Sequence, residues 1–201
     1  MIRKATLVVC TLVLALSAGF AAAATVPGPD TLKVDYFANA NTAGAPDGTV
    51  RLTNPGTIEA VSKTGGYGNT NICAAIFVFD PQQELSECCS CFLSPDGLRT
   101  LSVDVDVTGN PLTGVVLTTG LIKVVSTPTV SNTCPLPTSL NPTPAIRAWA
   151  THIQNSNFAI TETASQDATL SSAEVSRLQG ECYAINLDGS GKGICTCGTG
   201  D

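Results

Sequence analysis

The 201-residue chain has few charged and few aromatic side chains. Charged residues make up 13% of it and aromatic residues 5%, with one Trp, three Tyr and one His. A binder of nucleic acid needs a concentrated positive face, whereas the basic residues beyond Lys4 stand singly along the sequence. We therefore expect no nucleic acid among the partners, and few rings are available for a groove that stacks sugars.

Long apolar runs are also scarce, and the one that approaches membrane length lies at the N-terminus. Arg3 and Lys4 precede an apolar run over residues 7–16, and small residues follow at 21–24. This order predicts a cleaved signal peptide at 1–24 and a secreted chain at 25–201 without a membrane span. An uncleaved anchor over residues 5–24 is the competing interpretation. Cleavage would leave 8 basic and 16 acidic residues, a net charge of −8 that disfavours anionic membrane surfaces.

Cysteine is abundant, with nine in the chain and eight outside the leader. An even number of cysteines in an exported chain predicts disulfides, although eight allow 105 pairings and leave the connectivity open. A metal-thiolate cluster or a redox pair is the alternative for the run at 88–91. Neighbouring residues of an extended chain point to opposite faces, which favours separate distant partners. We expect no metal or cofactor, and structural disulfides at Cys73, Cys88, Cys89, Cys91, Cys134, Cys182, Cys195 and Cys197.

Hydrophobic patterning predicts a mainly β protein. Apolar and polar residues alternate over 32–36 and 101–107, as in half-buried strands. Denser β-branched runs at 72–79 and 115–125 indicate strands covered on both faces. Clusters of Gly, Pro, Asn and Asp separate the runs. We predict one disulfide-stapled β-sandwich of about seven strands, with the remaining strands at residues 49–52, 145–153 and 158–163.

Two segments depart from this pattern. Residues 126–144 contain five prolines around Cys134, which predicts a long surface connection pinned by a disulfide; a linker between two small domains is the alternative. Residues 171–174 have the spacing of a capping box, and Gly180 stands where a helix would end. They predict one short C-terminal helix at 172–179, while residues 84–91 are a weaker candidate for a helical turn.

Two motifs resemble ligand-binding loops. Asp104 and Asp106 match the opening of a calcium loop, but Val115 stands where its last ligand should be and the alternating valines favour a strand. Whether the two aspartates bind an ion is left open. Residues 188–193 are rich in glycine, but their spacing differs from a phosphate-binding loop, so we predict a loop that returns the last cysteines to the core.

His152 is the single imidazole of the chain. No Gly-x-Ser-x-Gly motif accompanies it, and its neighbours have the pattern of a strand, so we expect a surface or edge residue. Carboxylate pairs far apart in the sequence stay open as a source of glycoside chemistry. We predict no catalytic residues and do not expect an enzyme.

Several segments resemble a functionally uncharacterised group of secreted, cysteine-rich bacterial proteins. The likeness covers roughly residues 72–197, and it implies an exported protein and brings no catalytic residues to this chain. It rests on the cysteine run 88–91 with the following stretch 94–103, and on residues 170–174, 189–191 and 195–197.

Two functional classes follow from these features. The first is a structural or adhesive protein outside the cell or on its surface, which could assemble with copies of itself into a fibre. Residues 25–37 would serve as a strand donated to a neighbour, or they form the first strand of the chain's own sandwich. The second class is a small extracellular module that binds a ligand, an ion or a carbohydrate through the loops at 65–71 and 94–99. An enzyme of unknown type is the third class, after these two.

Overall fold

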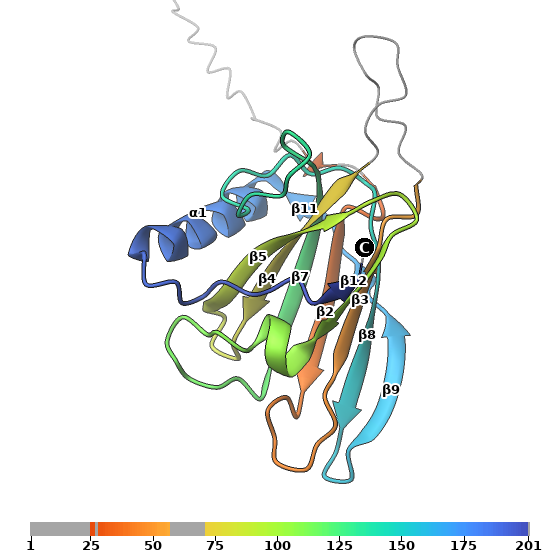
Figure 1. Ribbon diagram of the computed structural model, residues 1–201, viewed down its shortest axis with the longest axis vertical. Helices are drawn as coiled ribbons and strands as arrows, with labels where there is room; N and C mark the ends of the chain where they lie inside the picture. Colours follow the sequence, from red (N-terminus) through yellow and green to blue (C-terminus); the bar gives the residue numbers. More distant parts are fainter. Residues whose placement is uncertain (1–24, 27, 57–70, 201) are drawn as a thin grey trace, which may run out of the picture.

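The computed structural model describes residues 25, 26, 28–56 and 71–200 (Figure 1). The predicted signal peptide, and residues 65–70 of one predicted binding loop, lie outside these residues. The elements in chain order are β1 (Thr25–Val26), β2 (Leu32–Ala38), β3 (Thr49–Thr53), β4 (Ile72–Phe79), β5 (Leu85–Leu93), β6 (Leu98–Ser102), η1 (Val103–Val107), β7 (Thr119–Pro128), β8 (Arg147–Gln154), β9 (Ala159–Ala164), β10 (Gln166–Asp167), β11 (Leu170–Ser171), α1 (Ser172–Asp188) and β12 (Thr199–Gly200).

Two antiparallel sheets make up most of the structure, so the predicted mainly β class is confirmed. Sheet 1 has the strand order β10-β2-β7-β4-β5, and sheet 2 has the order β12-β6-β3-β8-β9. A core of buried side chains from both sheets lies between them, including Leu52 and Leu101 of sheet 2 and Ile76 of sheet 1. The short β1 pairs with β11 beside them.

β4 is buried along its whole length. Ile76 points into the core between the sheets, whereas Phe77 belongs to a second apolar cluster that includes Leu178 of α1. Successive side chains of a strand point to opposite faces, so a strand with both faces covered is apolar throughout. The dense apolar run therefore predicted the environment of β4 correctly.

β7 is central in sheet 1, as its apolar pattern predicted, but it lies further along the chain than expected. Val115 and Val116 are exposed in the preceding loop, and the strand begins at Thr119. It then continues into the proline-rich stretch and pairs with β4 as far as Pro128, which lies opposite Ile72. The prediction that no residue of 126–144 joins a central strand is wrong for its first three residues. Proline is tolerated at the end of a strand, where the ladder is finished.

The remainder of the proline-rich stretch is a connection, as predicted. Cys134 in this connection is bonded to Cys73 of β4. The Gln179 amide donates a hydrogen bond to Leu140 O at 3.3 Å, which joins the connection to α1. The connection thus lies on the side of sheet 1 that α1 also covers.

The predicted strand over 101–107 is wrong beyond Ser102, where a turn of π-helix, η1, replaces it. The Val105 N–H donates to Ser102 Oγ at 2.8 Å, and Asp106 Oδ2 accepts from the Ser102 N–H at 2.8 Å. Short polar side chains that capture nearby backbone groups compete with a strand ladder. Gly109 permits the turn, because a Cβ there would lie 2.2 Å from Val105 O.

The C-terminal helix is confirmed, but it is longer than predicted. Ser171 caps it by accepting the Glu174 N–H at 3.1 Å, as the capping-box spacing indicated. Gly180 lies inside the helix, which ends at Gly189 in the left-handed conformation (φ 65°). The helix continues because Leu178, Cys182 and Ile185 extend one buried stripe along sheet 1.

Residues 84–91 do not form the helical turn considered for them. Residues 85–93 form β5, which pairs with β4 and carries three of the cysteines. Cys88 is bonded to Cys182 of α1, and Cys89 to Cys195 in the C-terminal segment, so neighbouring cysteines bond in different directions. All eight cysteines in the described part of the chain are paired, with Cys91–Cys197 and Cys73–Cys134 as the other two bonds.

The glycine-rich segment after α1 returns the chain to β5, as predicted. The Cys88 N–H donates to Gly193 O at 2.8 Å, and the Gly193 N–H donates to Asn110 O at 2.8 Å. Gly193 has a φ of 74°, and a Cβ there would lie 2.8 Å from a methyl group of Ile185. The close approach of this segment to α1 therefore requires glycine.

The N-terminal strand belongs to the sheet of its own chain. β2 pairs with β7 along all seven residues and with β10 through Lys33 and Val34. Of the two interpretations of residues 25–37, the strand of the chain's own sandwich is therefore confirmed for β2. Donation of β2 to a neighbouring molecule would first require this strand to leave sheet 1.

Glu87 of β5 is buried among apolar side chains. It pairs with Val78 on β4 and is 0% exposed. Its Oε1 accepts the Asn110 N–H at 3.0 Å, whereas its Oε2 has no hydrogen-bond partner among the described residues. Burial raises the pKa of Glu87 to about 7, against the opposing effects of the Asn110 N–H and the Lys192 charge.

The raised pKa gives a test of this position. The folded protein holds the proton of Glu87 more tightly than the unfolded chain, so the free energy of unfolding should fall as pH rises from about 4.5 to about 7. Glu87→Gln keeps the acceptor for Asn110 but cannot ionise. We expect it to exceed the wild type in stability by about 1–3 kcal/mol at pH 8 and to match it near pH 4.5. Urea denaturation across this pH range measures both, and parallel profiles would contradict the assignment.

Candidate functional site

The two sheets differ in what covers their outer faces. α1 and the proline-rich connection lie over sheet 1, and α1 contacts β5 and β11 (Figure 1). Among the described residues no helix lies over the opposite side of the sandwich, which is the outer face of sheet 2. This face is therefore available to a partner.

Strand register defines the side chains of the outer face of sheet 2, because residues directly opposite each other in neighbouring strands share a face. Arg51 is opposite Thr100 on one side and Trp149 on the other. Val50 and Leu52 point the other way, into the core. The outer face of sheet 2 comprises Thr49, Arg51, Thr53, Leu98, Thr100, Ser102, Arg147, Trp149, Thr151, Ile160, Glu162 and Ala164.

Hydroxyl groups and one large aromatic ring dominate this face. Trp149 lies at the centre of the face and is 37% exposed. Arg51 forms an ion pair with Glu162 across β8, which leaves little net charge around the indole. The Thr49 and Thr151 hydroxyls are hydrogen-bonded to each other at 2.8 Å. The result is a sheet face with an apolar platform and several donors and acceptors beside it.

A hollow of about 550 Å³ borders the outer face of sheet 2 at β3 and β6. Thr49, Thr100 and Ser102 of the face line it, together with Asp106 of η1 and Thr196 of the C-terminal segment. Asp106 Oδ1 accepts the Thr196 hydroxyl at 2.6 Å. The hollow thus extends the hydroxyl-lined surface beyond the strands.

Asp104 and Asp106 do not converge on an ion. Asp104 Oδ1 accepts the Asn41 N–H at 2.9 Å, and burial raises the pKa of Asp104. The two Asp106 oxygens instead accept from Ser102 and Thr196. No group of three or more His, Cys, Asp or Glu side chains in the described residues could hold a metal ion.

His152 is buried, and the expectation of a surface or edge position is wrong. It is 3% exposed and lies where β2 of sheet 1 meets β8 of sheet 2. Its ring stacks on Tyr36 with centroids 4.2 Å apart. The pattern of strand residues around it was correct, but the sequence held no signal that β8 of sheet 2 packs against β2 of sheet 1.

The surroundings of His152 form a polar clamp between the sheets. His152 Nε2 lies 2.9 Å from Thr163 Oγ1 and 3.3 Å from Asp35 Oδ1. Asp35 Oδ2 accepts the Ser165 hydroxyl at 2.7 Å, and the Gln154 amide donates to the Tyr36 hydroxyl at 2.9 Å. A catalytic relay needs the hydroxyl and the carboxylate on different ring nitrogens. Here both lie at Nε2, so we interpret the cluster as structural.

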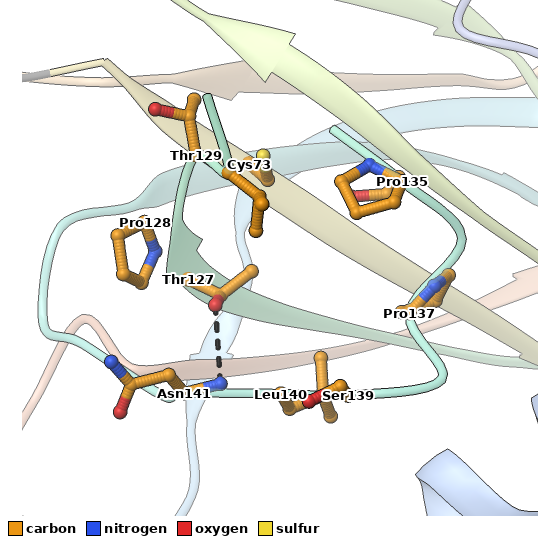
Figure 2. Close-up of a pocket in the computed structure, with 11 residues that line it drawn as sticks. Cys73, Thr127, Pro128, Thr129, Pro135, Pro137, Ser139, Leu140 and Asn141 are labelled. Carbon is orange, nitrogen blue, oxygen red and sulfur yellow. Dashed lines mark hydrogen bonds between the residues drawn. The ribbon is translucent and has the colours of Figure 1, made fainter. Parts of the chain in front are cut away.

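A cavity of about 260 Å³ lies under the proline-rich connection on sheet 1 (Figure 2). Figure 2 shows Pro128 on one side of it and Pro135 and Pro137 on the other. The Asn141 N–H donates to Thr127 Oγ1 at 3.2 Å at its base. None of the side chains that line it is charged, so the cavity is suited to a small neutral molecule.

Sequence reasoning missed the outer face of sheet 2. Of the binding loops that it predicted, residues 94–97 form the turn between β5 and β6, where the Gly97 N–H donates to Ser94 O at 3.0 Å, and residues 65–70 lie outside the described residues. Thr49, Arg51 and Thr53 alternate with apolar residues, which indicates one polar face. Their proximity to Trp149, about 100 residues later in the chain, depends on strand order.

Comparisons with known proteins found no match for this chain among protein-family models, curated proteins or solved structures. No helix in the described part of the chain combines the length and apolarity of a membrane span. Four disulfides are typical of proteins that fold in an oxidising compartment.

The polar clamp yields a stability prediction. Asp35→Ala should lower the free energy of unfolding by about 2–4 kcal/mol, because it removes the carboxylate that accepts the Ser165 hydroxyl and lies beside Nε2 of the buried His152. Asp35→Asn preserves the shape and one acceptor oxygen and should cost less than half as much. Chemical denaturation of both variants measures the difference. Equal losses, or none, would show that the clamp does not hold the sheets together.

Proposed function

We propose that this protein is a secreted structural or adhesive protein and that the outer face of sheet 2 is its adhesive surface. The observation that carries the proposal is the exposed indole of Trp149 on a hydroxyl-lined sheet face that no helix covers in the described part of the chain. An extended partner can lie along such a face, whereas a small molecule would find no enclosure there.

The chemistry of this face favours a neutral, hydroxylated polymer such as a polysaccharide. The C–H face of a sugar ring packs on an indole, and its hydroxyl groups can exchange hydrogen bonds with threonines and with the Arg51–Glu162 pair. The net charge of the predicted mature chain, −8, disfavours polyanionic polymers. One ring is a small platform, so we expect weak binding per molecule, strengthened where several copies act together.

The disulfides support an extracellular role for this scaffold. Cys89–Cys195 and Cys91–Cys197 each join residues 106 positions apart. In the chain-entropy model a crosslink over a loop of that size stabilises the folded state by roughly 4–5 kcal/mol. A protein that must persist outside the cell without repair benefits from such crosslinks.

Retention on insoluble polysaccharides tests the proposal. The oxidised protein should sediment with cellulose or chitin particles, and Trp149→Ala should reduce the bound fraction about tenfold because it removes the platform. Tyr183→Ala is the matched control, since Tyr183 is an exposed aromatic residue on α1, away from sheet 2. Retention unchanged by Trp149→Ala, or absent on both polymers, would reject the outer face of sheet 2 as a polysaccharide-binding surface.

A small ligand-binding module is the second candidate, and the uncharged cavity of Figure 2 favours it. Small neutral molecules that fit this cavity should raise the melting temperature by mass action. Ser139→Phe, which places a ring in the cavity, should abolish the rise without affecting polymer retention. Absence of any stabilising molecule in a thermal-shift screen of neutral hydroxylated compounds would count against this candidate.

A further inference from the structure

β9 has an open outer edge. It pairs with β8 on one side, and in the described part of the chain no strand or disulfide covers its other side. The edge of β5 is covered by the C-terminal segment, that of β6 by β12, and that of β2 in part by β10. β9 is also the free right-hand edge of the sandwich in Figure 1.

The hydrogen-bonding pattern shows which backbone groups point outward from β9. The Ser165 N–H donates to Ala148 O at 3.0 Å, just past the last ladder pair. Bonded and non-bonded pairs alternate along an antiparallel ladder, so Thr161 and Thr163 exchange hydrogen bonds with β8. Ile160, Glu162 and Ala164 therefore direct their N–H and C=O groups away from the sheet.

The side chains of β9 do not protect this edge from pairing. All six residues are exposed, with Ile160 at 59%. Proteins usually block an open edge with lysine, proline or a bulge. β9 contains no lysine or proline, its register with β8 is unbroken, and its one charged side chain, Glu162, is paired with Arg51 of the same molecule.

We propose that two copies of this chain associate by pairing their β9 strands antiparallel, which joins two copies of sheet 2 into one continuous sheet. A strand partner must be extended, have a free edge and carry little net charge, and β9 itself meets all three conditions. Antiparallel pairing of a strand with its own copy is two-fold symmetric, so one surface serves both molecules. We choose the register in which Thr161 lies opposite its own copy, because it pairs Ile160 with Glu162 of the copy and avoids the contact of two carboxylates that centring on Glu162 would give.

This association goes beyond the proposed adhesion and does not depend on it. It would place two outer faces of sheet 2 side by side on one surface and so provide two binding platforms. The predicted self-association through the N-terminal strand is a different route, which would first require β2 to leave its own sheet.

Sedimentation analysis of the oxidised full chain over increasing concentration tests the proposal. We expect a reversible monomer–dimer equilibrium. Ile160→Pro removes one outward N–H without breaking a bond to β8, and Ile160→Lys adds a charge that blocks the edge. Each should weaken dimerisation about tenfold or more. Leu187→Lys is the matched control, because Leu187 is an equally exposed apolar residue on α1, and it should leave the equilibrium unchanged.

Amide exchange supplies a second measurement that does not require a variant. The Ile160 and Glu162 amides should become protected as concentration rises, while those of Thr161 and Thr163 are already protected in the monomer by β8. A chain that stays monomeric at every concentration would overturn the proposal. The proposal would also be overturned if both Ile160 variants still dimerised and the Ile160 and Glu162 amides of the wild-type dimer still exchanged freely. Trp149→Ala, which alters the proposed adhesive surface on β8 and not the β9 edge, should leave the monomer–dimer equilibrium unchanged and so separates this association from the proposed adhesion.

Discussion

The arrangement of this protein depends on how β5 is fastened at the edge of sheet 1. β5 is paired with β4 on one side only, yet its Cys88 bonds to α1 and its Cys89 to the C-terminal segment. Because adjacent residues point to opposite faces, one strand holds a helix on its outer face and a returning chain on its inner face. The edge that would otherwise be open is thereby closed by covalent bonds.

The opposite side of the sandwich is closed in a different way. Asp35 and His152 meet there within a hydrogen-bonded cluster, and Tyr36 stacks on the imidazole. Disulfides are covalent bonds, whereas the polar clamp consists of hydrogen bonds and close polar contacts. Sheet 1 is therefore fastened covalently to the C-terminal segment on the side of β5, and the two sheets are held by polar contacts on the side of β2 and β8, next to the open strand β9.

This asymmetry extends to the faces of the sandwich. Sheet 1 is covered on its outer side by α1, whose Glu174 binds Lys123 of β7 at 2.6 Å, and two basic neighbours lower the pKa of Glu174 to about 2. Sheet 2 has no such cover in the described residues, and its polar outer face and β9 are exposed. The adhesive surface and the pairing edge are therefore both placed on sheet 2.

The sequence by itself determined the mainly β class, the fully buried β4, the capped start of α1 and the returning glycine-rich segment. Each of these follows from local patterning or from backbone restrictions on one or a few residues. Tertiary structure decided where the predicted strands and helices end. η1 replaces the end of a predicted strand because the side chains of Ser102 and Asp106 accept hydrogen bonds from nearby backbone N–H groups. α1 continues past Gly180 because its apolar stripe packs on sheet 1. Tertiary structure also decided the disulfide partners, the burial of His152 and the meeting of Arg51 with Trp149. These depend on strand order across some 100 residues, and no local property of the chain encodes which strands become neighbours.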